Sequence, residues 1–70
     1  MAKGETKSAR RLRAIEQGAT ARSGGLNVDD NPYSQTEWGL GTFWKMGYEQ
    51  QIERERLGMA EPHPRFRVAA

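Results

Sequence analysis

The chain has 70 residues, no cysteine, 36% apolar residues, a formal net charge of +2 and a mean hydropathy of -0.90. This length allows one small domain, and so few apolar residues cannot both line a deep substrate cavity and wall it off. The lack of cysteine excludes disulfides, thiolate metal sites and thiol catalysis. No signal peptide and no run of about 20 apolar residues is visible, so we expect a cytoplasmic protein without a membrane partner.

The basic charge is concentrated at the N-terminal end of the chain. Residues 1–13 carry five basic side chains and one acidic one, a net charge of +4, whereas residues 14–70 carry six basic and eight acidic ones, a net charge of -2. Concentrated Lys and Arg attract polyanions, because each neutralised phosphate can release condensed counterions. The same charge is also typical of a solubilising tail. We expect residues 1–7 to form a flexible basic arm.

A first helix is predicted over residues 8–24, and either Thr6 or Ser8 can cap its start. Its apolar and small residues recur at helical spacing and form one narrow face. They are Leu12, Ala14, Ile15, Gly18, Ala19, Ala21 and Gly25. Gly18 in mid-helix costs about 1 kcal/mol relative to Ala, a cost that is explained if another backbone or an aromatic ring packs there. The pair Gly24-Gly25 ends the helix, since glycine readily adopts the left-handed conformation of a C-terminal cap.

The segment from Leu26 to Pro32 is predicted to be a loop. Asp and Asn favour turns, and Pro32 moves Asn31 out of helical geometry. The adjacent acidic residues of this loop repel phosphates and are typical of solvated turn residues. Any RNA contact made by the loop is therefore expected from Asn31, Tyr33 or the backbone.

A second helix is predicted over residues 35–57, beginning at a Ser-x-x-Glu capping box at Ser34. Four apolar residues recur in it at every fourth position, namely Leu40, Trp44, Tyr48 and Ile52. Residues 38–42 can instead form a separate turn or a kink. Gly58 ends the helix, and two prolines make residues 59–70 a flexible tail. The expected fold is therefore all-α, a two-helix hairpin over residues 8–58 with a Pro-containing connecting loop.

The sequence offers little for catalysis. The only histidine, His63, lies between two prolines in the predicted tail, where a general base has no fixed position. There is no zinc-ligand spacing and no glycine-rich phosphate loop followed by Lys. We therefore expect no catalytic residue, no metal and no cofactor. Aromatic residues beside a basic arm are the components of single-stranded RNA binding, although Trp44 and Tyr48 share one stripe and are expected in the core.

Three motifs follow one another between residues 12 and 50: Gly-x-x-Ala-x-x-x-Gly, then Pro-Tyr, then Trp-x-x-Gly-aromatic-acidic. The matching positions are Gly18, Ala21, Gly25, Pro32, Tyr33, Trp44, Gly47, Tyr48 and Glu49. In this order they resemble the ribosome modulation factor family of small bacterial helical-hairpin proteins. The resemblance implies a protein that binds the small ribosomal subunit near the 3′ end of its RNA. Such a protein blocks translation by covering the messenger's binding region, and promotes ribosome hibernation as inactive dimers.

The resemblance also implies roles for single residues. Those expected to bind nucleic acid are Lys7, Arg10, Arg11, Arg13, Asn31 and Tyr33, the last two by shaping the turn at the RNA surface. Those expected to pack the helices are Gly18, Ala21, Gly25, Trp44, Gly47 and Tyr48. The partner would be the small ribosomal subunit or its RNA.

Other functions stay open on the sequence alone. The near-neutral body can form a protein-interaction module, for instance a phage- or plasmid-encoded inhibitor of a host enzyme. The related CrpP-like proteins suggest an ATP-dependent antibiotic-modifying enzyme, although the chain has no phosphate loop to support one. The stripe of small residues can serve a contact within one chain or a homodimer. The sequence does not decide between ribosomal RNA, another RNA and DNA as the polyanion.

Overall fold

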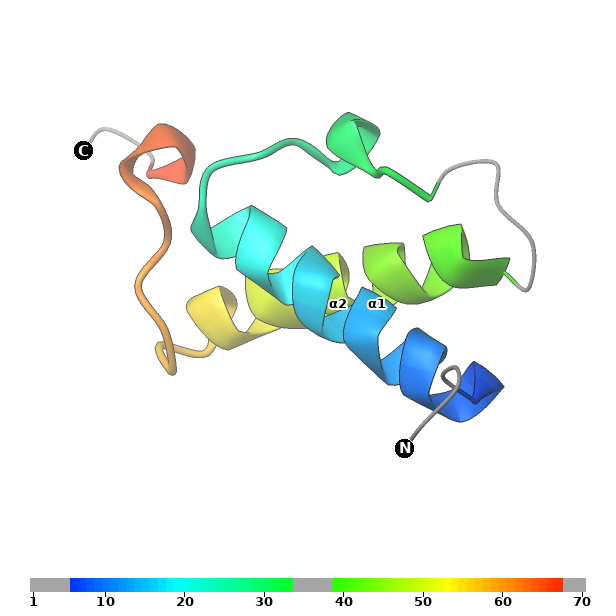
Figure 1. Cartoon of the computed structure of the whole chain (residues 1–70). Coiled ribbons are helices and arrows are strands. Elements are labelled where there is room, and N and C mark those ends of the chain that lie inside the picture. Colours follow the sequence, from blue (N-terminus) through cyan, green and yellow to red (C-terminus); the bar gives the residue numbers. More distant parts are fainter. Residues whose placement is uncertain (1–5, 34–38, 68–70) are drawn as a thin grey trace.

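The computed structural model describes residues 6–33 and 39–67, and all regular structure in these ranges is helical. Two α-helices, α1 (Lys7–Ser23) and α2 (Leu40–Arg56), pack against each other. Two short 3-10 helices, η1 (Val28–Asp30) and η3 (Pro64–Phe66), lie in the segments that follow them. Figure 1 shows α1 and α2 crossing, with the segment that carries η1 arching over the pair. The predicted all-α two-helix hairpin is confirmed.

The start of α1 is capped by Thr6, whose Oγ1 accepts a hydrogen bond of 3.1 Å from the backbone N–H of Ala9. The helix therefore begins at Lys7, which belongs to α1 rather than to the arm predicted over residues 1–7. Residues 1–5 of that arm lie outside the described residues.

Both α-helices end in the same way, with a left-handed glycine just past the last turn. At the end of α1 this residue is Gly25 (φ 88°), and the next N–H, that of Leu26, donates to the carbonyl of Ala21 at 3.0 Å. At the end of α2 it is Gly58 (φ 78°), followed by a bond of 2.8 Å from the N–H of Met59 to the carbonyl of Arg54. These hydrogen bonds satisfy carbonyls that a helix end leaves without an intrahelical partner.

The described part of α2 begins at Leu40 and not at residue 35, the start predicted from the sequence. The reason is Gly39, whose left-handed conformation (φ 67°, ψ 24°) interrupts a right-handed helix. The predicted capping box at Ser34 and the aromatic residue Trp38 lie outside the described residues.

The two helices touch through their backbones at a pair of glycines. A Cβ atom added to Gly18 would lie 1.8 Å from the carbonyl oxygen of Trp44 on α2. A Cβ added to Gly47 would likewise lie 1.8 Å from the carbonyl oxygen of Ile15 on α1. Neither position has room for a side chain, so the helices can only approach this closely because both residues are glycine.

The core fills the space beside this backbone contact. Among the described residues it consists of five buried ones, Ala14, Ala21, Leu40, Trp44 and Tyr48. Trp44 and Tyr48 are 2% and 4% exposed, and their rings stack with centroids 5.4 Å apart. Trp44 is the largest fully buried side chain among the described residues, so this small domain depends on one aromatic pair for much of its apolar burial.

A largely buried ion pair joins the C-terminal ends of the two helices. The guanidinium of Arg22, on α1, donates from Nη2 to Oε1 of Glu55, on α2, at 2.8 Å, and from Nε to the same carboxylate at 3.1 Å. The two side chains are only 14% and 6% exposed. The hydrogen bond to Glu55 raises the pKa of Arg22, so the guanidinium stays charged at any physiological pH.

Residues 59–67, which we call the C-terminal segment, return to the end of α1 (Figure 1). The ring of Phe66 lies 3.6 Å from the guanidinium carbon of Arg22, and Arg65 donates from Nη1 to the carbonyl of Gly25 at 2.8 Å. The imidazole of His63 packs against Gly25, where an added Cβ would lie 2.7 Å from Cε1. The sequence predicts a flexible tail over residues 59–70, whereas residues 59–67 make these defined contacts, because prolines prevent helix without preventing docking.

Gly18→Ala is expected to destabilise the protein by about 3 kcal/mol, because the methyl group would overlap the carbonyl of Trp44. The free energy of unfolding of a domain of this size seldom exceeds about 3–5 kcal/mol, so the variant should be largely unfolded at 25 °C. Thermal unfolding followed by circular dichroism measures the effect.

The matched control is Gly24→Ala, where the nearest atom to the added Cβ is a backbone oxygen 3.3 Å away. The free energy of unfolding of that variant should lie within about 1 kcal/mol of the parent's value, since Ala also has a better helix propensity than Gly. Equal stability of the two variants would contradict the backbone contact.

Phe66→Ala is expected to lower the free energy of unfolding by about 1–2 kcal/mol, because it removes the ring that covers the Arg22 guanidinium. The backbone N–H groups of Phe66 and Arg67, which are hydrogen-bonded within η3, should then exchange with solvent faster. Hydrogen exchange measured by NMR reports both amides. Unchanged exchange rates would show that the ring does not hold the C-terminal segment in place.

Candidate nucleic-acid interface

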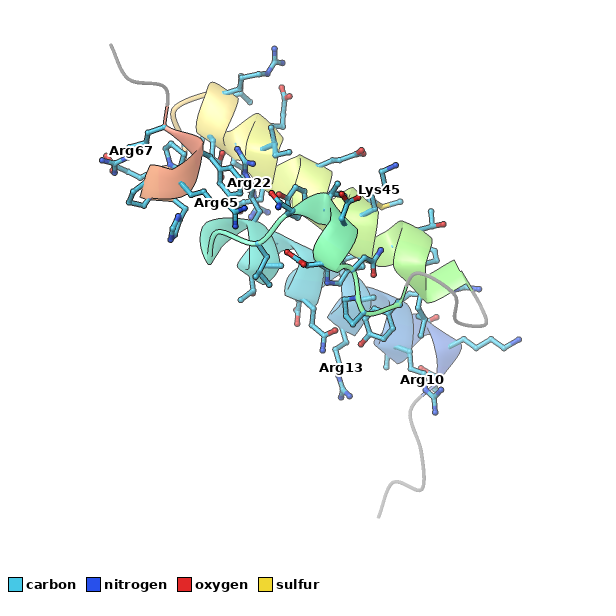
Figure 2. All side chains as sticks on the ribbon, turned by 90° about the horizontal axis from the view of Figure 1, so that it is seen from above. Arg10, Arg13, Arg22, Lys45, Arg65 and Arg67 are labelled. Atoms are coloured by element: carbon cyan, nitrogen blue, oxygen red, sulfur yellow. The ribbon has the colours of Figure 1, made fainter. Side chains whose placement is uncertain are left out.

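The N-terminal half of α1 carries four basic side chains and no acidic one between residues 6 and 15. We call this set, Lys7, Arg10, Arg11 and Arg13, the basic patch. Lys7, Arg10 and Arg11 are neighbours at the i, i+3 and i+4 positions of one helix. Figure 2 shows Arg10 and Arg13 projecting away from the helix pair along the same edge. The fold therefore concentrates positive charge over about two turns of α1.

The helix itself adds to this positive potential. The N-terminus of α1 carries the positive end of the helix dipole, and no acidic side chain lies in its first turn to offset it. The guanidinium of Arg11 lies over the ring of Phe43 at 5.3 Å, and Lys7, Arg10 and Arg13 also have contacts within the chain. Contacts of a guanidinium with an aromatic ring orient the cation and leave its charge in place.

The structure brings Tyr33 to the basic patch, although the two lie far apart in the sequence. Tyr33, Arg10, Arg13 and Leu40 line a small hollow of about 180 Å³. The hydroxyl of Tyr33 donates to Oε1 of Gln17 at 2.6 Å, which fixes the ring against α1. An aromatic ring held beside two guanidinium groups is an arrangement suited to stacking on a base while phosphates pair with arginine.

Asn31 has a different position from the other predicted binding residues. Its Oδ1 accepts the backbone N–H of Tyr33 at 2.8 Å, and its Nδ2 donates to the carbonyl of Gly41 at 2.9 Å. The side chain thus ties the loop to α2 and sets the position of Tyr33. Asn31 thus shapes the turn through these internal hydrogen bonds.

The six residues expected to pack the helices all lie buried in the structure. Five of them, Gly18, Ala21, Trp44, Gly47 and Tyr48, lie at or beside the crossing of α1 and α2. Gly25 lies elsewhere, beneath the imidazole of His63 and with its carbonyl bound to Arg65. The small-residue stripe of α1 therefore serves two contacts, one with α2 and one with the C-terminal segment.

A second group of cations lies at the opposite end of the molecule, as the labels in Figure 2 show. Arg22 pairs with Glu55, Arg65 binds the carbonyl of Gly25, and Arg67 pairs with Glu61 at 2.7 Å. This cluster is not among the sites predicted from the sequence. The one signal for it is the run Pro-Arg-Phe-Arg in the supposed tail, where an aromatic residue lies between two arginines. These guanidinium groups hold the C-terminal segment, so the basic patch is the better candidate interface.

Within the described residues, no three His, Cys, Asp or Glu side chains converge as a metal site would require. In the same part of the chain, no helix combines the length and the apolar character needed to cross a bilayer. Comparison with known proteins finds no matching family model, no matching curated protein and no matching solved structure.

Asn31→Ala is expected to lower the free energy of unfolding by about 1–2 kcal/mol, because it removes two hydrogen bonds that are partly shielded from water. Urea denaturation measures this loss. Asp29→Ala in the same loop is the control, since Asp29 is exposed and its side chain makes no hydrogen bond within residues 6–33 and 39–67. If both substitutions had the same small effect, Asn31 would not position Tyr33.

Proposed function

We propose that the chain binds ribosomal RNA of the small subunit and blocks translation by occupying the surface that the messenger needs. The observation that carries the proposal is the basic patch with Tyr33 beside it. Phosphate contacts from clustered Arg and Lys supply affinity for RNA. The choice of the small ribosomal subunit rests on the resemblance of the Gly18–Glu49 motifs to ribosome modulation factors.

The mechanism requires no reaction and no cofactor. The basic patch would dock the protein on the phosphate backbone, and Tyr33 would stack on an unpaired base. The remainder of the helix pair would then act as a steric obstacle. Support for this role comes from the backbone contacts of Gly18 with Trp44 and of Gly47 with Ile15, because two helices in backbone contact form a stiff body that a messenger cannot easily displace.

The salt dependence of binding to isolated small ribosomal subunits tests the proposal. Replacement of Arg10, Arg11 and Arg13 together by Ala should lower the slope of log K against log salt concentration by about 2–3, since each phosphate contact contributes about 0.7–0.9. Affinity at low salt should fall with it. The measurement is co-sedimentation of labelled protein with subunits over a series of salt concentrations.

A matched triple variant on α2, Lys45→Ala with Arg54→Ala and Arg56→Ala, removes the same net charge from another surface. Its slope should change by less than about 1. Equal losses in the two variants would reduce the interaction to a general effect of net charge. No measurable binding of the parent chain to subunits at low salt would overturn the proposed function.

A further inference from the structure

A groove runs between α1 and the loop over residues 24–32, and this loop is the segment that arches over the helix pair in Figure 1. It has a volume of about 800 Å³ and is open to solvent. Helix α1 contributes one wall and the loop the other, and Trp44 of α2, which is 2% exposed, also borders the groove. The groove is separate from the hollow beside Tyr33, which has a different set of lining residues.

Hydrogen bonds at both ends of the loop hold the groove open. At one end the hydroxyl of Tyr48 donates to the carbonyl of Leu26 at 2.6 Å. At the other end Tyr33 bonds to Gln17, and Asn31 bonds to the carbonyl of Gly41. A groove with fixed walls binds a partner without the cost of ordering a loop.

The lining combines carboxylates with apolar surface and contains no basic residue. The carboxylates are Glu16, on α1, and Asp30, on η1, and neither forms an ion pair with another described residue. Asp30 accepts one hydrogen bond, of 2.9 Å, from the backbone N–H of Asn27. The apolar part comes from Ala21, Leu26, Pro32 and Trp44. Leu26 is 46% exposed, which leaves aliphatic surface available beside the two negative charges.

We propose that this groove is a docking site for a basic segment of another protein, with an arginine or lysine next to an aliphatic residue. Such side chains place an aliphatic stem on apolar surface and a cationic head beside carboxylates. Pockets for small molecules bury most of their ligand, so an open groove suits a polypeptide lying across it better than a small organic cation. The two carboxylates repel RNA phosphates, so this groove is distinct from the proposed RNA-binding surface. The inference therefore goes beyond the proposed function and does not depend on it.

The test uses the full-length protein labelled with ¹⁵N and a blocked hexapeptide, Gly-Leu-Arg-Leu-Arg-Gly, as the probe. The amide signals of Thr20, Ala21, Gly24 and Leu26 should shift in a saturable way as peptide is added. A peptide with Glu in place of both Arg residues should produce no such shifts. A peptide with Ser in place of both Leu residues should bind more weakly.

Two variants and one control test the charged and the apolar part of the site. Glu16→Gln with Asp30→Asn should weaken binding of the peptide about 10-fold, because two rim charges are lost. Glu49→Gln with Glu53→Gln removes the same charge from the exposed surface of α2 and should change the affinity less than about 2-fold. Thr20→Trp keeps both carboxylates and fills the groove from its exposed wall, and should abolish binding if the peptide lies inside.

Three results would overturn the inference. The first is the absence of saturable shifts at the groove. The second is an equal effect of both double charge variants, which would indicate attraction to acidic charge in general. The third is concentration-dependent self-association that is lost in Glu16→Gln with Asp30→Asn. In that case the occupant is a second copy, whose Leu12 is 61% exposed between two arginines. Retained binding to ribosomal subunits alongside any of these results would leave the proposed function standing.

Discussion

The direct contact of two helix backbones at Gly18 and Gly47 is the constraint on which the rest of this structure depends. With carbonyl oxygens occupying the space that a Cβ would need, α1 and α2 approach more closely than side chains would allow. The large side chains must then pack beside the crossing, which is where Trp44 and Tyr48 stack. A chain with 36% apolar residues obtains a well-packed core in this way from few large residues.

The features of the fold that could be predicted are those that depend on residues close together in the sequence. The four-residue repeat of α2 identifies Trp44 and Tyr48 as inward-facing because periodicity depends only on helix geometry. A glycine in mid-helix is costly, so the position of Gly18 in the sequence is enough to indicate a close contact. The charge of the basic patch is equally local, since four cations within one short stretch of helix must lie near one another.

The part that could not be predicted depends on contacts between residues far apart in the chain. The ion pair between Arg22 and Glu55 spans 33 residues, and the bond from Arg65 to the Gly25 carbonyl spans 40. No local rule relates such positions, and prolines near the C-terminus indicate only that a helix does not continue. The placement of Tyr33 beside Arg10 has the same origin, because it follows from the hydrogen bonds of Asn31 and Gln17.

Helix α1 and the hydrogen bonds of the loop fix how opposite charges are arranged over the surface. The basic patch lies on the first two turns of α1, and Glu16 of the acidic groove follows within one further turn of the same helix. Because the loop that completes the groove is tied to α2 and to Gln17, the two surfaces keep a constant relation to each other. Under the proposed function, a stiff helix pair with adjoining positive and negative surfaces would bind a partner that presents phosphates beside basic protein segments in one orientation, where a uniformly basic peptide would bind any RNA.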